Sequence, residues 1–312
     1  MASLSSSPAS DYRGRLAPSP TGYLHVGHAR TFFAAFERAR EAGGTLVMRV
    51  EDLDPDRSRT SYADAALEDL RWLGIGWQEG PDIGGPFAPY AQSSRGQVYL
   101  EAWRSLLRGG FLYPCRCSRK DLESALAAPH EGASTGGQAN PLQDPPDDEP
   151  IYPGTCRPDL ESFKRIVESG ANGNDKPEAF HWRFRVNDGE AIEFEDRNLG
   201  PQRFIAGKDF GDFVVWRRDG VPSYQLACVA DDAAMRITEV VRGADLLKST
   251  ARQILLNRAL GFQNPDWFHC GLVVDRQGRR LAKRHDSLSL RTLRQRGFSP
   301  ISILSGELPV EV

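Results

Sequence analysis

One short stretch near the start of the chain constrains the fold more than any other. Residues 14–17 have an apolar, extended character, and they lead through a Pro/Gly turn to His25, Gly27 and His28. Apolar residues then recur at spacings of three and four over residues 29–42, which predicts a helix. A strand that ends beside a helix N-terminus is typical of α/β folds, so the sequence predicts this class.

The same stretch indicates a chemistry. A helix N-terminus offers backbone N–H groups and the positive end of the helix dipole, and both suit a phosphate group. His25 and His28 can add donors that follow the charge developing on a phosphoryl group. The alternative is a chance pair of histidines, one of them in the core, but the fourteen residues of the stretch together disfavour it.

Composition bounds the remaining possibilities. The chain has 312 residues, 40% hydrophobic and 26% charged, which is typical of a soluble globular protein with one large or two modest domains. No apolar run is long enough to span a bilayer, and residues 1–12 lack the features of a secretory signal. Five cysteines, an odd number, favour a reducing cytoplasm over a disulfide framework.

The net charge of −3 does not point to a nucleic-acid binder. Residues 276–296 nevertheless hold eight arginines and lysines and one acidic residue. Such a stripe could contact a phosphate backbone, or it could be a solvated basic face.

Strand-like and helix-like segments alternate along the first part of the chain, which favours a parallel sheet. We expect these elements: a strand at 46–50, helices at 61–73 and 97–108, antiparallel strands within 180–220, a helix from 224, a strand at 237–241 and an amphipathic helix at 246–260. The pattern predicts a doubly wound Rossmann-type nucleotide-binding domain, whose ligands lie at the carboxyl ends of the strands.

The expected domain organisation follows from where this pattern is interrupted. A small α+β insertion divides the Rossmann-type domain, and a short helical segment ends the chain. The expected parts are a flexible tail (1–12), the catalytic domain (13–110 and 206–275), the insertion (111–205) with a mobile Gly/Pro-rich loop (125–150), and a C-terminal segment (276–312).

Two motifs carry a resemblance to a known family. Residues 15–28 resemble the HIGH motif of class I aminoacyl-tRNA synthetases, and residues 17–22 resemble the glutamyl branch in particular. Residues 281–285 resemble the KMSKS loop of the same family, although Arg280 and Ala282 replace its first lysine and its serine. The resemblance implies that His25, Gly27, His28 and Lys283 bind ATP, which carries Mg²⁺, and that both histidines and Lys283 are catalytic. A lysine on such a loop would stabilise the departing pyrophosphate.

The resemblance also implies a glutamate-binding set: Arg15, Leu16, Ala17, Pro18, Ser19, Glu51, Tyr224 and Arg242. In the family, the residue that matches Glu51 meets the amino group of the substrate. A guanidinium that pairs with a carboxylate in bidentate fashion would disfavour a neutral amide by roughly a thousandfold. The alternative for Glu51 is a structural ion pair with Arg49 or Arg57.

Three cysteines indicate a metal site. The thiolates of Cys115, Cys117 and Cys156 suit tetrahedral Zn²⁺, which would be structural, and free thiols are the alternative. The resemblance implies Tyr152, four residues before Cys156, as the fourth ligand, with His130 or His181 as substitutes. The apolar surroundings of Cys228 and Cys270 predict core residues.

The resemblance extends over residues 13–305, and the chain ends about 30 residues after Lys283. This length resembles a truncated paralogue family, the glutamyl-queuosine tRNA(Asp) synthetases, in which no anticodon-binding domain is expected. The resemblance implies a cytoplasmic monomer without membrane contact. It would activate L-glutamate with ATP without needing tRNA, and transfer it to queuosine in the anticodon of tRNA(Asp). The alternatives are a catalytic fragment of a glutamyl-tRNA synthetase that charges tRNA(Glu), and a non-catalytic tRNA- or nucleotide-binding protein.

Overall fold

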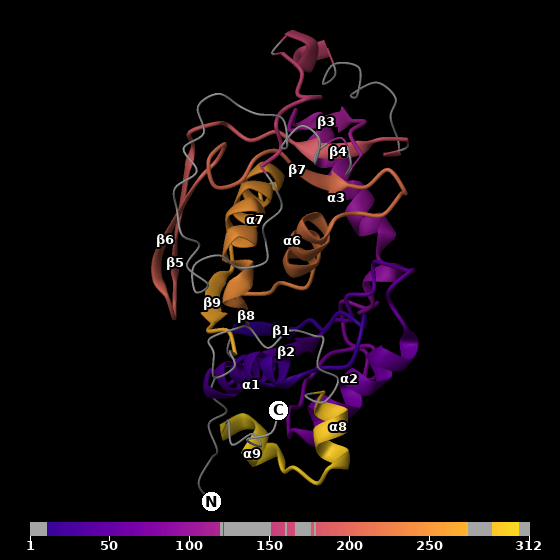
Figure 1. Ribbon diagram of the computed structural model, residues 1–312, viewed down its shortest axis with the longest axis vertical. Helices are drawn as coiled ribbons and strands as arrows, with labels where there is room; N and C mark the ends of the chain where they lie inside the picture. Colours follow the sequence, from indigo (N-terminus) through magenta and orange to yellow (C-terminus); the bar gives the residue numbers. More distant parts are fainter. Residues whose placement is uncertain are drawn as a thin grey trace, which may run out of the picture. The chain divides into compact units, whose positions relative to one another are not determined.

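The structure, a computed structural model, describes residues 11–118, 121, 151–159, 161–165, 176–177, 179–273 and 289–305. The chain folds into two units (Figure 1). The first comprises residues 1–94, 234–243 and 265–312, and the second comprises residues 95–233 and 244–264. The predicted loop at 125–150 and the KMSKS-like residues 281–285 lie outside the described residues.

Two pairs of parallel strands form the sheet structure of the first unit. Strand β1 (Arg13–Leu16) pairs with β2 (Thr45–Met48), and β8 (Glu239–Gly243) pairs with β9 (Asp266–Cys270). The backbone N–H of Thr238 donates to the carbonyl oxygen of Arg13 at 2.9 Å, which holds β8 beside β1. The predicted parallel strands are confirmed with slightly shifted bounds, and β9 is a strand that the sequence pattern did not predict.

Helices cover these strands within the first unit. Helix α1 (Val26–Glu41) packs against β1, β2 and β8, and α9 (Pro300–Ser305) packs against α1. Helix α2 (Thr60–Trp72) packs against α8 (Leu290–Gln295). Apolar side chains from all of these elements share one core, including Leu16, Ala29, Phe32, Met48, Leu70, Val241, Leu293 and Ile303. Burial of this apolar face holds the ends of β1 and β8 next to the start of α1.

Antiparallel strands characterise the second unit. One sheet has the order β3 (Leu112–Cys115), β4 (His181–Phe184) and β7 (Phe213–Trp216), and β5 (Ala191–Asp196) forms a hairpin with β6 (Gly200–Ile205). The predicted antiparallel region is therefore confirmed. Within 180–220 the sequence pattern predicted strands at 181–186, 191–195 and 211–217. It missed β6, because Gly200 and Pro201 at its start are typical turn residues.

Among the described residues of the second unit, the longer helices are α3 (Gly96–Arg108), α6 (Tyr224–Ala234) and α7 (Leu247–Leu260). The prediction that α7 is amphipathic was wrong, because residues 249–257 are all buried. Polar residues of this helix have partners in the interior: Ser249 Oγ accepts from Gln225 Nε2 at 2.9 Å, and Asn257 Nδ2 donates to Asn264 Oδ1 at 2.8 Å. Hydrogen bonds of this kind let polar side chains lie inside a protein.

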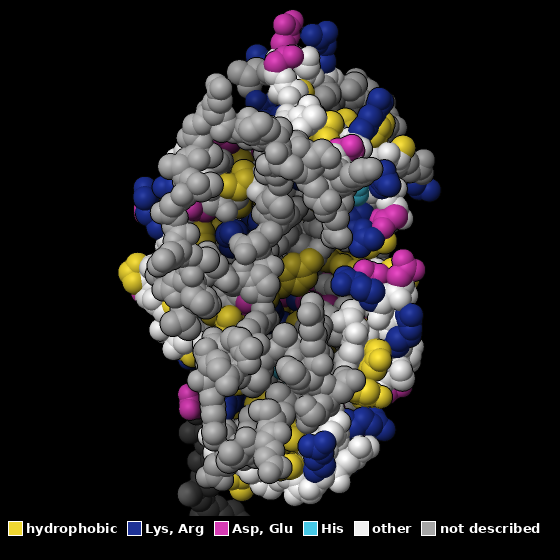
Figure 2. Space-filling view, viewed as in Figure 1, with side chains coloured by type: hydrophobic (Ala, Val, Ile, Leu, Met, Phe, Trp, Pro, Cys, Tyr) yellow, Lys and Arg dark blue, Asp and Glu magenta, His cyan; other side chains and the backbone are white. Residues whose placement is uncertain are grey.

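None of the helices in the described part of the chain combines the length and the apolar run that a membrane crossing needs. Among the described side chains visible in Figure 2, both basic (Lys, Arg) and acidic (Asp, Glu) side chains occur.

Candidate functional site

The two predicted catalytic histidines close the N-terminus of α1. His25 is the N-cap, and its Nδ1 accepts the backbone N–H of Gly27 at 3.1 Å. His28 Nδ1 accepts the backbone N–H of His25 at 3.2 Å, and the two rings stack with centroids 3.8 Å apart. This reciprocal arrangement is a capping box, so the histidines satisfy backbone N–H groups that the sequence pattern left open to phosphate.

The capping box determines which ring nitrogen carries a proton. A neutral imidazole whose Nδ1 accepts a hydrogen bond has its proton on Nε2. Nε2–H is then the donor that each ring can present to a phosphoryl oxygen. Gly27 permits this arrangement, because a Cβ at this position would lie 3.0 Å from Cε1 of His25.

Two buried arginines lie on the adjacent strands β1 and β8. Arg15 is 4% exposed, and its Nη1 donates to the carbonyl oxygen of Val241 at 3.0 Å. Arg242 is also 4% exposed, and its Nε donates to Nε2 of His269 at 3.2 Å. Both guanidiniums therefore occur at the strand ends where ligands bind in α/β sheets.

The loop after β1 is fixed to the segment after β2. The backbone N–H of Arg49 donates to the carbonyl oxygen of Leu16 at 2.8 Å, and that of Glu51 donates to the carbonyl oxygen of Pro18 at 3.0 Å. Leu16 and Pro18 are buried, Ala17 is half-buried and Ser19 is exposed. Of these four residues, Ser19 is thus the one whose side chain solvent reaches most readily.

Glu51 forms the ion pair that was the structural alternative for it. Its Oε1 lies 3.0 Å from Nη2 of Arg49, whose side chain is fully buried, whereas Arg57 pairs with Asp54 at 2.8 Å. A carboxylate accepts several hydrogen bonds at once. The pair with Arg49 therefore orients Glu51 and is compatible with binding an amino group.

The first unit holds most of the predicted ATP and glutamate ligands, and two further predicted ligands stand apart from this observation. Tyr224 is the half-buried first residue of α6, in the second unit. Lys283 lies outside the described residues.

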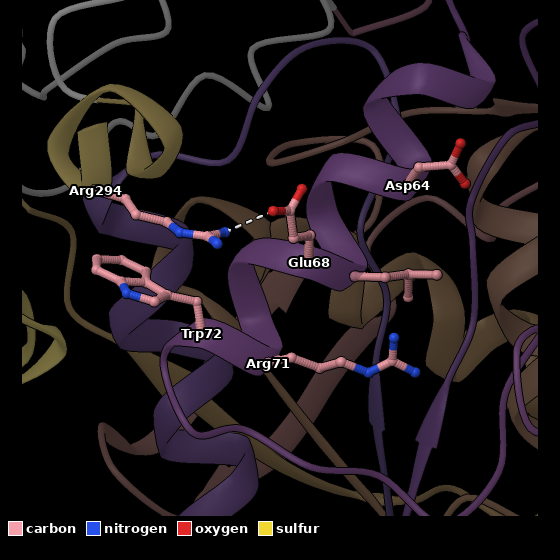
Figure 3. A pocket seen from close by; sticks show the side chains of 6 residues that line it. Asp64, Glu68, Arg71, Trp72 and Arg294 are labelled. Atoms are coloured by element: carbon pink, nitrogen blue, oxygen red, sulfur yellow. Dashed lines mark hydrogen bonds and ion pairs between the residues drawn. The ribbon is translucent and has the colours of Figure 1, made fainter.

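A shallow surface pocket occurs elsewhere in the first unit, between α2 and α8 (Figure 3). It is lined by Asp64, Leu67, Glu68, Arg71, Trp72 and Arg294. Glu68 and Arg294 form an ion pair at 2.8 Å across it. None of the predicted site residues that the structure describes lines this pocket, so it is separate from them.

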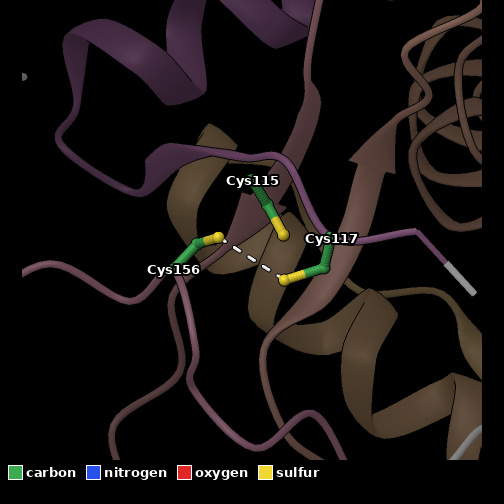
Figure 4. A group of neighbouring side chains, drawn as sticks. All are labelled: Cys115, Cys117 and Cys156. Atoms are coloured by element: carbon green, nitrogen blue, oxygen red, sulfur yellow. Dashed lines mark hydrogen bonds between the residues drawn. The ribbon is translucent and has the colours of Figure 1, made fainter. Parts of the chain in front are cut away.

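The second unit holds the predicted cysteine cluster (Figure 4). The sulfur atoms of Cys115, Cys117 and Cys156 lie within 4.8 Å of one another, and those of Cys117 and Cys156 are 3.5 Å apart. Tyr152 Oη lies 3.4 Å from the Cys115 sulfur and 3.6 Å from the Cys117 sulfur. Thiolates arranged tetrahedrally at about 2.3 Å from zinc would be about 3.8 Å apart, so these spacings fit a zinc ion.

The geometry favours Tyr152 over histidine as a fourth ligand. His181 is described by the structure but is not a member of the cysteine cluster. Its Nδ1 accepts the backbone N–H of Arg218 at 3.4 Å. His130 lies outside the described residues. All five cysteines are free thiols, with Cys228 buried as predicted and Cys270 at the partly buried edge of the core.

Arg183 is a residue of this cluster that the sequence analysis missed. Its Nε donates to the Cys115 sulfur at 3.3 Å, and its guanidinium lies 3.9 Å from the centre of the Tyr152 ring. Arg183 is 2% exposed and donates from Nη1 to the carbonyl oxygen of Asp212 at 2.9 Å. Alternation along β4 puts Arg183 on the face opposite Trp182 and Phe184, so the sequence pattern gave no signal for its burial.

Burial and hydrogen bonds give two thiols of the cluster different pKa values. Burial raises the pKa of Cys117 to about 11. For Cys156, burial is outweighed by the backbone N–H of Arg116 and by the Cys117 and Tyr152 side chains, which lower the pKa to about 7. Cys156 is therefore the thiol of this pair that ionises more readily near neutral pH.

Comparison with known proteins confirms the resemblance carried by the two sequence motifs. The family model for the catalytic domain of class I tRNA synthetases (E and Q) matches residues 12–307. The Glutamyl-Q tRNA(Asp) synthetase of Symbiobacterium thermophilum is 47% identical, over 93% of this chain and 84% of that protein. The protein of the same name from Nitratidesulfovibrio vulgaris is 46% identical, over 95% of this chain and 85% of that protein.

Longer proteins match the same residues over a smaller share of their length. Glutamate–tRNA ligase 2 of Nitrosococcus oceani is 42% identical over 92% of this chain, which covers 56% of that ligase. The solved glutamate tRNA ligase of Elizabethkingia meningosepticum, in complex with its amino acid, is 28% identical with a TM-score of 0.70, and this chain covers 53% of it. The chain thus spans about half of that solved protein. The chain belongs to the class I tRNA synthetase family, in its E and Q branch, and it matches Glutamyl-Q tRNA(Asp) synthetases over most of their length.

Proposed function

We propose that this enzyme activates L-glutamate with ATP and transfers the glutamyl group to queuosine in the anticodon of tRNA(Asp). The observation that carries the proposal is sequence identity. The chain is 47% and 46% identical to the two Glutamyl-Q tRNA(Asp) synthetases, and 42% identical to the glutamate–tRNA ligase 2. The activation step would not need tRNA, and the enzyme would act as a monomer in the cytoplasm, where free thiols are stable.

The first step forms an adenylate. An oxygen of the glutamate α-carboxylate bonds to the α-phosphorus of ATP, and the bond from that phosphorus to the bridging oxygen breaks and releases pyrophosphate. Mg²⁺ bound to ATP supplies charge neutralisation on the phosphates. His25 and His28 donate from Nε2 to phosphoryl oxygens, and Lys283 stabilises the pyrophosphate. Gly27 lets the backbone approach the phosphates of ATP closely.

Residues of the first unit select glutamate. Arg15 and Arg242 supply the positive charge for the substrate carboxylates, and Glu51 accepts from the amino group. Leu16, Ala17, Pro18 and Ser19 line the substrate on one side, and Tyr224 is the remaining proposed glutamate ligand. The two buried guanidiniums disfavour glutamine relative to glutamate, because the side-chain amide of glutamine has no negative charge with which to neutralise a guanidinium.

The second step transfers the glutamyl group. A hydroxyl oxygen of the queuosine cyclopentenediol attacks the carbonyl carbon of the adenylate, its proton leaves, and AMP departs. A modified base in an anticodon loop is single-stranded and can enter a pocket. No covalent intermediate with the enzyme is needed.

The domain organisation in this proposal follows the sequence. A doubly wound Rossmann-type domain of residues 13–110 and 206–275 carries the chemistry, between a tail of residues 1–12 and the C-terminal segment 276–312. The insertion of residues 111–205 holds one structural zinc ion through Cys115, Cys117, Tyr152 and Cys156. The metal would hold strand β3 close to the segment around residue 156, and it would take no part in the reaction.

Glutamate-dependent exchange of pyrophosphate into ATP, measured with and without tRNA, tests the proposal. Exchange without tRNA, followed by transfer of labelled glutamate to queuosine-containing tRNA(Asp), is the expected result. Exchange that requires tRNA(Glu) would identify a glutamyl-tRNA synthetase fragment. Absence of exchange under both conditions would identify a non-catalytic tRNA- or nucleotide-binding protein.

A further inference from the structure

Arg242 has a buried neighbour whose role the activation chemistry does not assign. Strands β8 and β9 run parallel with Arg242 opposite His269. Arg242 Nε donates to His269 Nε2 at 3.2 Å, and His269 is fully buried. The ring of Trp267, two residues along the same strand, lies 5.1 Å from the guanidinium carbon. Arg242 is thus contacted by two side chains from one face of β9.

The direction of this hydrogen bond fixes the state of His269. A ring nitrogen that accepts a hydrogen bond carries no proton, so the imidazole is neutral with its proton on Nδ1. A neutral acceptor orients a guanidinium without cancelling its charge. A carboxylate in the same place would bind Arg242 more strongly, and it would then compete with a carboxylate of the substrate.

The bond also determines how Arg242 can pair. When Nε–H is engaged, a guanidinium can still form two parallel hydrogen bonds to a carboxylate through its terminal nitrogens. An arginine side chain has many rotamers in solution, and a fixed Nε removes part of that freedom before the substrate binds.

We propose that His269 is a positioning residue, which holds the Arg242 guanidinium ready for end-on pairing with a carboxylate of glutamate. This inference rests on the proposed function, because it takes Arg242 as a glutamate ligand. His269 does not touch the substrate itself. Its loss should therefore weaken glutamate binding and leave the ATP-binding residues at the start of α1 unaffected.

A matched pair of polar variants tests this role in the full-length enzyme. In His269→Gln, the side-chain oxygen reaches about as far as Nε2 and can accept from Arg242, whereas the shorter side chain of His269→Asn cannot. His269→Leu removes the acceptor with a similar volume. The initial rate of glutamate-dependent ATP–pyrophosphate exchange gives KM for glutamate and for ATP, and thermal melting reports the fold.

The expected result is a KM for glutamate raised roughly tenfold to a hundredfold in His269→Asn and His269→Leu, with little change in KM for ATP. His269→Gln should recover most of the loss. If His269→Leu does not fold, the Gln and Asn variants decide the matter, since both keep a polar side chain.

Three other outcomes would overturn the inference. Equal KM for glutamate in the wild type, Gln and Asn variants would show that the acceptor does not matter. Parallel loss of glutamate affinity, ATP affinity and melting temperature in all three variants would show a purely structural role. Wild-type enzyme without glutamate-dependent exchange would refute the proposed function as well, which distinguishes that failure from the first two.

Discussion

The buried carboxyl of Asp69 should make the stability of the first unit depend on pH. Asp69 lies on α2 with 1% of its surface exposed, and its Oδ2 has no hydrogen-bond partner among the described residues. Burial, and next the charge of Glu68, raise the pKa of Asp69 to about 6, against the opposing effect of Arg294 and Arg291 on α8. Glu68 and Arg294 belong to the pocket in Figure 3.

The sign and size of the effect follow from this pKa. Between about pH 4 and pH 6 the folded protein binds more protons at Asp69 than the unfolded chain does. The free energy of unfolding therefore falls as the pH rises through this window, and the full loss is present above it. Since one pKa unit corresponds to about 1.4 kcal/mol, a rise from 3.8 to about 6 amounts to about 3 kcal/mol.

Asp69→Asn removes the charge but buries an amide, whose incompletely bonded donors cost about 1–2 kcal/mol. We therefore expect the variant to be more stable than the wild type by about 1–2 kcal/mol at pH 8, and to be no more stable at pH 4. Urea unfolding followed by circular dichroism at both pH values measures this difference. Asp64→Asn is the matched control, because Asp64 is exposed on the same helix and should change stability by less than about 0.5 kcal/mol.

The decisive quantity is the change between the two pH values in the stability difference of variant and wild type. A stability difference that is the same at pH 4 and pH 8 would falsify the assignment of a raised pKa to Asp69. The same change in Asp64→Asn would instead indicate a general effect of net charge.

Three further predictions concern the candidate sites. Lys283→Ala should abolish glutamate-dependent exchange and leave the melting temperature unchanged; near-normal exchange would exclude its role with pyrophosphate. Cys115→Ser should release zinc and lower the melting temperature, whereas Cys228→Ser should keep the metal, as measured by elemental analysis; wild-type protein purified without zinc would contradict this. Gly27→Ala should lower the exchange rate roughly tenfold to a hundredfold, because its Cβ would lie 3.0 Å from Cε1 of His25 and displace that ring. Gly76→Ala, with open space around its Cβ, is the control, and equal rates in the two variants would contradict the steric argument.

The sequence predicted those elements whose residues carry a local signal. The helix after His28 was predicted from its apolar spacing, but the structure starts α1 at Val26, because His25 rather than a typical Ser or Asp acts as the cap. Strand β9 was missed because Asp266 and His269 interrupt its apolar pattern. In each case the deciding contact comes from a segment or a side chain that local periodicity does not register.

The cysteine cluster could be predicted in its members but not in its surroundings. The cysteine pattern identified Cys115, Cys117 and Cys156, the family resemblance implied Tyr152, and the structure places their ligand atoms close together. Arg183 could not be assigned from spacing, because its approach to Cys115 depends on the pairing of β3 with β4. Pairing between strands that lie far apart in the sequence cannot be inferred from the pattern of neighbouring residues.

Buried arginines explain both what the first unit can bind and why hydropathy alone could not locate the site. Arg15, Arg49 and Arg242 are at most 4% exposed, although arginine is ordinarily a surface residue. Burial of a guanidinium opposes folding unless hydrogen bonds compensate, and each of the three has one. The bonds of Arg15 and Arg242 described here go to neutral acceptors, a carbonyl and an imidazole, and those bonds leave the positive charge in place. In the proposed function, the two carboxylates of glutamate would accept further hydrogen bonds from these guanidiniums.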